Sequence, residues 1–355
     1  MILFITTRAH TLDIARRLRQ FASLGEDVRH VVLAQGAFAE FRGRAPIGQA
    51  MRRLWGLARG IFRLRRALAG LSERDILFVH ALDALAVTRI ARRLAGNRSR
   101  LACQVLDVHY YLLEPGLRGA ILRAIERRLL RGLDLLVVPN AGNMPGHYRP
   151  VARYTGPFAI VHNTLPTGER GAVPPPLAYD GVWTIGWFGS LRCERALTIL
   201  CETARRMGPK LRVLTAGLLK FPPGRFERAI AGLANVTYLG PFDAPADVAA
   251  LYAQAHMSYA LHFEPPVKAE WALPVRILEG GAYGRPALAR ADADCGAFVR
   301  DNAIGWTVGN TADDLIALLT RLEEPEYRRV EANVRAREDL FVGERELAAA
   351  LAMLR

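Results

Sequence analysis

Short apolar runs alternate with longer amphipathic stretches along the chain, and this alternation limits the possible fold more than any other feature. The runs of the first half are ILFIT, VRHVVLA, DILFVHA and LACQVLD, at residues 2–6, 28–34, 75–81 and 101–107. A stretch with helical spacing follows most of them, as in DIARRLRQFASL at residues 13–24. This βαβ rhythm is typical of a parallel sheet covered by helices, so the sequence predicts an α/β protein.

The same rhythm starts again after a break, which indicates a second domain. The break is TGERGAVPPPLAYDG at residues 167–181, which is rich in Gly and Pro and has no apolar period. Beyond it come the strand-like runs VWTIGWFGS, LRVLTAG, NVTYLG, MSYALHF and PALAR. We therefore expect one doubly wound, Rossmann-like domain at 1–165, a linker at 166–181 and a second such domain at 182–355, whose last helix is able to pack back on the first.

Several classes of protein are excluded by composition. The four cysteines are scattered and form no CxxC pair, so neither a zinc ribbon nor a secreted disulfide framework is predicted. The histidines, including His10, His147 and His162, form no HExxH motif, and we expect no bound metal. Arginines interrupt every apolar run before the roughly 20 residues that a membrane-spanning helix needs. The first residues also differ from a signal peptide, so we expect a cytoplasmic protein.

The positive charge of the chain lies entirely in its first half. Residues 1–165 hold 26 Lys and Arg against 11 Asp and Glu, whereas the second half is nearly neutral. Such a field attracts polyanions, and the absence of a recognition motif argues against nucleic acid. The densest part, MRRLWGLARGIFRLRRALAGL at residues 51–71, has the spacing of a basic amphipathic helix. This helix either packs on its own domain or lies on an anionic membrane surface.

Two stretches of the second half have residues suited to binding phosphates. WFGSLRCERALTIL puts Gly189 between a strand and a helix, where backbone N–H groups can hold a phosphate, and Arg192 adds a charged donor. ALPVRILEGGAYGRPAL places Arg276 three residues before Glu279 on one helical face. A carboxylate can accept two ribose hydroxyls, and an arginine can bind a diphosphate. The alternatives are a plain connecting turn and a buried helix with small residues for close packing.

These stretches, together with VTYLGPF and IVHNTLP, resemble bacterial glycosyltransferases of the GT-B fold, particularly exopolysaccharide glycosyltransferases of the succinoglycan type. The resemblance covers nearly the whole chain and implies two Rossmann-like domains facing a cleft. It implies that Glu279 binds the ribose of a nucleotide-sugar donor and that Gly280 and Gly281 approach the diphosphate. It also implies that the loop from Gly189 to Arg192 closes over the phosphates.

The chain departs from the broader superfamily at one position. That superfamily often has two glutamates eight positions apart, and the partner of Glu279 falls at Trp271, which is not acidic. Glu270 or Lys268 is the candidate to replace it. A lysine there would offset the negative charge of the leaving diphosphate, and its alternative role is that of a solvated loop charge.

The resemblance assigns the acceptor side and any general base to the first domain. Asp107 and His109 follow a predicted strand, where GT-B enzymes present a catalytic Asp or His. We expect Asp107 to deprotonate the acceptor hydroxyl, with His109 as second choice. Asp107 could instead cap the following turn. His80 and Asp83 lie at another strand-to-helix junction, and Asp83 is equally suited to cap the helix.

The resemblance predicts a glycosyltransferase that moves a sugar from a nucleotide sugar, UDP-linked by expectation, to a polyprenyl-diphosphate-linked saccharide. It would work without a cofactor or metal, as a peripheral protein on the inner face of the cytoplasmic membrane. Two alternatives stay open. A nucleotide-sugar 2-epimerase shares the architecture, and the non-acidic Trp271 suggests a non-catalytic scaffold.

Overall fold

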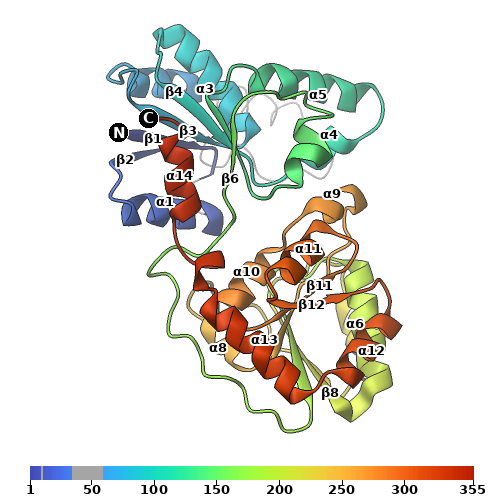
Figure 1. Ribbon diagram of the computed structural model, residues 1–355. Coiled ribbons are helices and arrows are strands. Elements are labelled where there is room, and N and C mark those ends of the chain that lie inside the picture. The colour runs from blue at the N-terminus through green and yellow to red at the C-terminus, as the bar shows by residue number, and fades with distance from the viewer. Residues whose placement is uncertain (9–10, 34–58) are drawn as a thin grey trace. The chain divides into compact units, whose positions relative to one another are not determined.

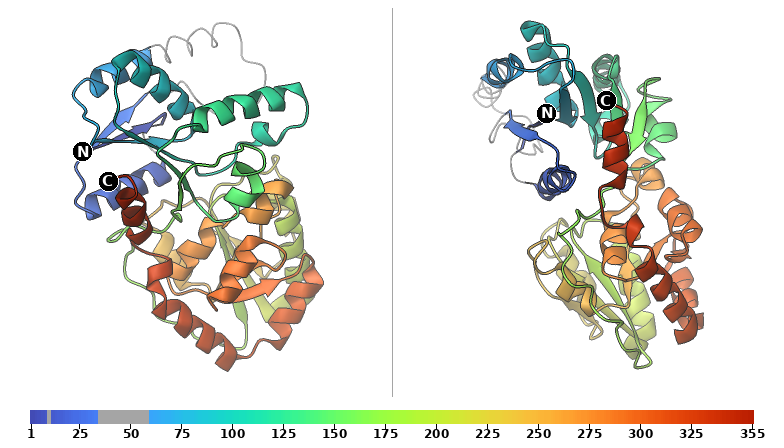
Figure 2. Two further views of the ribbon diagram at one scale, coloured as in Figure 1. Left: turned by 45° about the horizontal axis from the view of Figure 1, so that its top comes forward. Right: turned by 60° about the vertical axis from the view of Figure 1, so that its left-hand side comes forward.

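The computed structural model describes residues 1–8, 11–33 and 59–355, which form two compact units (Figure 1). Met1–His162 and Glu344–Arg355 make the first unit, and Asn163–Gly343 makes the second. Both are α/β units, as the alternation of the sequence predicts (Figure 2). The division differs from the predicted ranges of 1–165, 166–181 and 182–355, because the presumed linker belongs to the second unit. The last helix belongs to the first unit, which is the packing that the sequence analysis allowed.

The first unit is built on a parallel six-stranded sheet with the order β2-β1-β3-β4-β5-β6. Its central strands are buried on both faces, which explains why they are continuously apolar. The strands are β1 (Ile2–Thr6), β2 (Val28–Val32), β3 (Ile76–His80), β4 (Arg100–Gln104), β5 (Leu135–Val138) and β6 (Phe158–Ile160). The α-helices are α1 (Leu12–Ser23), α3 (Leu82–Ala95), α4 (Tyr110–Leu113), α5 (Leu117–Leu130) and α14 (Arg345–Ala352).

The second unit repeats this plan with the strand order β12-β11-β10-β7-β8-β9, again all parallel. The strands are β7 (Trp183–Phe188), β8 (Leu211–Ala216), β9 (Val236–Tyr238), β10 (Met257–Tyr259), β11 (Ala287–Arg290) and β12 (Gly305–Val308). The α-helices are α6 (Glu194–Met207), α7 (Arg225–Ile230), α8 (Val248–Ala253), α9 (Pro266–Trp271), α10 (Val275–Ala282), α11 (Asp294–Asp301), α12 (Ala312–Arg321) and α13 (Glu324–Ala336).

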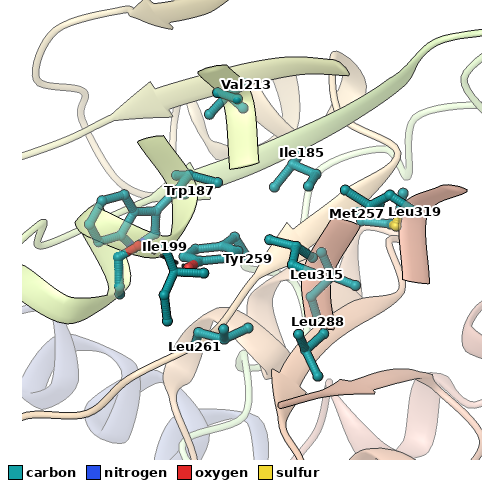
Figure 3. Close-up of a cluster of buried hydrophobic side chains, with 14 of the residues drawn as sticks. Ile185, Trp187, Ile199, Val213, Met257, Tyr259, Leu261, Leu288, Leu315 and Leu319 are labelled. Atoms are coloured by element: carbon teal, nitrogen blue, oxygen red, sulfur yellow. Dashed lines mark hydrogen bonds between the residues drawn. The ribbon is translucent and has the colours of Figure 1, made fainter. Parts of the chain in front are cut away.

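The core of the second unit fixes the strands that carry the candidate site. Figure 3 shows Trp187 of β7 and Tyr259 of β10 packed beside Ile199 of α6. The two rings meet edge to face with centroids 5.8 Å apart. The Tyr259 hydroxyl also donates to the carbonyl of Ala196 at 2.9 Å, which ties β10 to the first turn of α6. The ends of β7 and β10 are therefore rigidly placed.

Strands β5, β6 and β12 are not among those predicted from the sequence. These strands have only four, three and four residues, but β9, β10 and β11 are equally short and were predicted, so length alone does not explain the difference. β5 also follows the apolar end of α5 closely, so that periodicity does not separate the two elements. The strands predicted from the longer runs are all present.

The Pro-rich stretch predicted to be a linker is instead an extended strap along the second unit, which Figure 1 shows as a long segment without helices. Three arginine side chains hold it by its carbonyl oxygens. Arg335 Nη2 donates to the oxygen of Pro174 at 2.7 Å, Arg285 Nη2 to Pro175 at 2.9 Å, and Arg328 Nη2 to Leu177 at 3.0 Å. Prolines lack an N–H but keep this acceptor, so a Pro-rich strap suits arginine anchors.

The predicted basic helix at 51–71 lies partly outside the described residues. Its described part, residues 59–68, is helical, and Gly60, Leu64 and Leu68 are buried while Phe62 is exposed. This part packs on its own unit, one of the two alternatives. No helix among the described residues is both long enough and apolar enough to cross a bilayer.

Candidate functional site

The candidate donor site lies where the strand order of the second unit reverses, at the carboxyl ends of β7 and β10. Ligands of open α/β sheets bind at such a point. Gly189 follows β7 with a φ of 109°, and Gly217 follows β8 with a φ of 125°. A Cβ atom on Gly217 would lie 1.9 Å from the Gly189 carbonyl oxygen, so the two loops touch backbone to backbone. No side chain therefore separates the start of the loop from Gly189 to Arg192 from the backbone at Gly217.

The helix after this loop already has a carboxylate at its amino end. The backbone N–H of Glu194, the first residue of α6, donates to Glu264 Oε1 at 3.0 Å. A phosphate at this end of α6 would compete with Glu264 for the same donor. The geometry therefore favours side-chain cations over the α6 N–H groups as the main phosphate ligands.

Arg276 is brought to the Gly189 loop, as the predicted site requires. It stands in the first turn of α10, and its Nη2 donates to the carbonyl of Ser190 at 3.1 Å. Its Cζ lies 5.9 Å from the centre of the Trp187 ring. Burial and the charge of Arg192 lower the pKa of Arg276, while the charge of Glu279 opposes this shift. The guanidinium is thus held in place beside a second cation.

The charges of four side chains, Arg192, Lys268, Arg276 and Arg290, act on the half-buried His262, and we call these four the cationic cluster. Burial and the charges of these four side chains lower the pKa of His262 to about 3, so its imidazole is neutral at physiological pH. The members come from four segments of the second unit. Such a concentration of positive charge is suited to a dianionic ligand.

Arg290 and His262 are site residues that the sequence analysis did not single out. Arg290 ends β11, and its Nη1 donates to the His262 carbonyl at 3.1 Å, while its Nε donates to Asp292 at 3.0 Å. His262 is the last residue but one of the run MSYALHF, so its place after a strand was a usable signal. The convergence of these residues depends on the neighbouring positions of β10 and β11 in the sheet.

Gly280 and Gly281 stand where helix α10 packs so closely on its neighbours that a Cβ atom would not fit. A Cβ atom on Gly280 would lie 2.7 Å from the Cβ of Ser258, and one on Gly281 would lie 2.3 Å from the ring of Phe341. These glycines let α10 approach its neighbours closely, and Glu279 on the same helix is half-buried. The predicted roles of Gly280 and Gly281 at the diphosphate stay predictions.

At Trp271, the position of the missing acid, the structure has a buried indole. Within the described part of the chain its Nε1 has no hydrogen-bond partner. Glu270 beside it is exposed, whereas Lys268 on the same helix is half-buried and contributes to the charge around His262. Of the two candidates, Lys268 is therefore the one that the structure brings to the cluster.

In the first unit, Asp107 and His109 lie in the exposed loop after β4. His109 has a local structural role, because its Nδ1 accepts from the N–H of Tyr111 at 3.4 Å at the start of α4. Its ring stacks on Tyr110 and Tyr111, with centroids 4.7 and 4.9 Å away. Both predicted bases are exposed, and their catalytic roles stay predictions.

A histidine and carboxylate pair that was not predicted joins the end of β3 to the first turn of α1. His80 Nε2 is 3.0 Å from Asp13 Oδ2, and burial of Asp13 is outweighed by His80, which holds the pKa of that carboxyl below its usual value. Ala81, the next residue, has a φ of 76°, which costs strain for a residue with a Cβ. Asp83, in the first turn of α3, accepts a hydrogen bond from the N–H of Ala84 at 2.9 Å and so stabilises the start of its own helix. The sequence does not predict the role of Asp13, because its pairing with His80 depends on β1 and β3 being neighbours in the sheet.

The structure gives no candidate metal centre among residues 1–8, 11–33 and 59–355, where no three His, Cys, Asp or Glu side chains gather suitably.

Comparison with known proteins gives one sequence relative and several similar structures. No protein-family model matches the chain. The chain is 27% identical over 289 residues to the succinoglycan biosynthesis protein ExoL of Rhizobium meliloti. The aligned region covers 78% of this chain and 71% of that protein. The structure of Anabaena Alr3699/HepE in complex with UDP and glucose has a TM-score of 0.71 at 13% identity and covers 99% of both chains. The lipopolysaccharide outer core galactosyltransferase WaaB has a TM-score of 0.64 at 14% identity, also over 99% of both chains. The predicted fold class and the predicted resemblance are confirmed.

Proposed function

We propose that this GT-B glycosyltransferase, of the type found in exopolysaccharide and lipopolysaccharide synthesis, moves a sugar from a UDP-sugar to a polyprenyl-diphosphate-linked saccharide. The observation that carries the proposal is the cationic cluster around His262 at the strand-order reversal of the second unit. UDP is favoured as the nucleotide because the similar HepE structure holds UDP and glucose. The likeness to ExoL favours a saccharide acceptor of exopolysaccharide synthesis.

In this proposal the second unit stabilises the leaving group. As the bond between the anomeric carbon and the diphosphate breaks, negative charge grows on the diphosphate oxygens. Arg276, whose Nη2 is bound to the Ser190 carbonyl, and the other members of the cationic cluster would offset that charge. Positive side chains can thus take the part that a metal has in other transferases, and we expect no metal requirement. Glu279 accepts the ribose hydroxyls.

In this proposal the first unit binds the acceptor and supplies the general base. The acceptor hydroxyl oxygen attacks the anomeric carbon while its proton passes to the carboxylate of Asp107, and UDP leaves with the electrons of the broken bond. This direct displacement inverts the configuration of the sugar. A lipid-linked acceptor would require the basic first unit to meet the cytoplasmic face of a membrane.

The donor site is tested by calorimetric titration of UDP, GDP, ADP and dTDP into the protein. We expect UDP to bind best and Glu279→Ala to weaken its binding about tenfold or more, because hydrogen bonds to a charged acceptor are lost. Glu270→Ala removes an exposed carboxylate nearby and should leave the affinity unchanged. Equal affinity for UDP in Glu279→Ala would show that the ribose site is misplaced. Binding of none of the four nucleotides would favour a scaffold over an enzyme.

The base is tested by Asp107→Asn, which keeps the size of the side chain. We expect the turnover number for transfer to fall by a factor of about 10²–10⁴, with UDP affinity unchanged, since a general base acts only on the acceptor proton. Asp83→Asn, at the helix start of α3, is the control and should transfer at close to the normal rate. Full transfer activity in Asp107→Asn would exclude this carboxylate as the base.

A further inference from the structure

Helix α5 of the first unit presents an apolar face that no described residue covers. Leu117, Ile121 and Ile125 are spaced four residues apart, so they stand on one side of the helix. Their exposed fractions are 77%, 51% and 49%. The exposed residues of this helix, which we call the outer face of α5, are Leu117, Arg118, Ala120, Ile121, Ala124, Ile125 and Arg128. A contiguous exposed apolar strip of this kind indicates an interaction surface.

The opposite side of α5 fixes the helix firmly to its unit. Arg123 Nη1 donates to the carbonyls of Leu112 and Glu114 at 3.0 and 2.8 Å. Arg127 Nε donates to the Val151 carbonyl at 3.1 Å. The helix is therefore preformed, and a partner on its outer face would not have to order it first.

The carboxyl end of α5 is fixed in the same way by its neighbour α3. Arg89 Nε donates to the Leu129 carbonyl and its Nη2 to the Arg131 carbonyl, each at 2.7 Å. Figure 1 shows α3 and α5 near one another in the first unit.

The charge on the outer face is entirely positive. Arg118 and Arg128 are exposed on it, and Arg131 follows directly after the helix. The single carboxylate of α5, Glu126, points inward, where both of its oxygens lie 2.9–3.0 Å from His147 Nε2 in a fully buried pair. An anionic partner would therefore meet no repelling charge from this helix.

Tyrosines stand beside the first turn of α5. Tyr110 of α4 is half exposed, and the guanidinium of Arg118 lies 4.1 Å from the centre of the Tyr111 ring. Tyrosine and arginine are side chains that favour the boundary between water and lipid headgroups.

We propose that the outer face of α5 is a membrane-docking surface, which lays Leu117, Ile121 and Ile125 among the acyl chains of an anionic bilayer while Arg118 and Arg128 contact its headgroups. Isoleucine, leucine and alanine side chains flanked by arginines match an amphipathic helix lying in the plane of the interface. The lack of any carboxylate on the face favours lipid over a protein partner, whose surface normally offers both signs of charge. This inference rests on the proposed lipid-linked acceptor and names the surface that would reach it.

The test is sedimentation with vesicles of phosphatidylcholine alone and of phosphatidylcholine mixed equally with phosphatidylglycerol. We expect the full chain to pellet with the anionic vesicles and much less with the neutral ones, and added salt should weaken the binding. The triple variant Leu117→Ser, Ile121→Ser, Ile125→Ser should lower the partition coefficient about tenfold or more. The double variant Arg118→Gln, Arg128→Gln should also lower it about tenfold at low salt.

Matched controls separate this surface from general effects of charge and hydrophobicity. Met353→Ser removes an apolar side chain that is 55% exposed elsewhere in the same unit. Arg74→Gln with Arg98→Gln removes two exposed charges near the amino ends of β3 and β4. Both controls should stay within about twofold of the unchanged protein. Unchanged circular dichroism would show that the exposed triple substitution leaves the fold intact.

Each contrary result has a distinct meaning. Equal pelleting of the triple variant and the unchanged protein, or no pelleting with anionic vesicles at all, would overturn the docking surface. A dimer in sedimentation velocity that the triple variant separates, without vesicle binding, would assign the face to a second copy of the chain. UDP binding is measured alongside. If UDP binds while vesicles do not, only this inference fails, and if no nucleotide binds, the proposed function fails by itself.

Discussion

Replacing Glu331 with alanine should lower the free energy of unfolding of the second unit by about 3–5 kcal/mol. Glu331 Oε1 accepts from Arg285 Nη1 at 3.0 Å, and the exposed fractions of the two side chains are 3% and 0%. Arg328 Nη1 donates to the second carboxylate oxygen at 2.9 Å. Without Glu331, the buried Arg285 charge would lose its counter-charge, and an uncompensated buried charge is among the most destabilising defects in a protein.

The strap should loosen in the same variant, because Arg285, Arg328 and Arg335 all lie within 4.0 Å of Glu331 and also bind the strap carbonyls. Urea denaturation followed by tryptophan fluorescence measures the stability, and limited proteolysis at residues 166–181 measures the strap. Glu324→Ala is the matched control, since Glu324 also pairs with Arg328 on α13 but is 43% exposed. It should cost less than about 1 kcal/mol. An equal, small loss in both variants would contradict this account.

Arg276→Ala should weaken UDP binding about a hundredfold while changing the affinity for uridine much less. The guanidinium is held against the Gly189 loop by the Ser190 carbonyl, so the position of its charge is set before any ligand arrives. Uridine has no phosphates, and comparing the two ligands therefore isolates the charge-assisted bonds from the ribose and base contacts.

Calorimetry of both ligands with the variant gives the comparison directly. Arg300→Ala removes one exposed positive charge from the same unit and should leave both affinities unchanged. Parallel losses for uridine and UDP would mean that Arg276 shapes the site as a whole and does not act on the diphosphate. An unchanged UDP affinity would remove Arg276 from the donor site.

The sequence predicted the architecture because the relevant signals are local. Strands buried on both faces are apolar throughout, and helices that cover them are amphipathic, so the α/β class follows from runs of five to fifteen residues. The place of Gly189 directly after a strand, and those of Arg276 and Glu279 on one helix, follow from the same patterns. Chemistry at the carboxyl ends of parallel strands is a property of the fold class, which the sequence already indicates.

The strap could not be predicted from its own residues. Gly and Pro without an apolar period are typical of a free linker, and nothing in residues 167–181 shows that arginines more than a hundred positions later bind their carbonyls. The pairing of His80 with Asp13 and the gathering of Arg290 and His262 depend likewise on which strands are neighbours.

In helix α5 the sequence does not show which of the apolar residues are buried. Its sequence has apolar residues around much of the helix, and only packing decides that Leu130 is buried while Leu117 is exposed. By itself the sequence determined the elements, the fold class and the kinds of side chain at the strand ends, because these depend on contacts between near neighbours in the chain. The tertiary structure alone decided which distant side chains share a site and which apolar faces stay open, because strand order and helix packing join residues whose separation in sequence has no periodic signal.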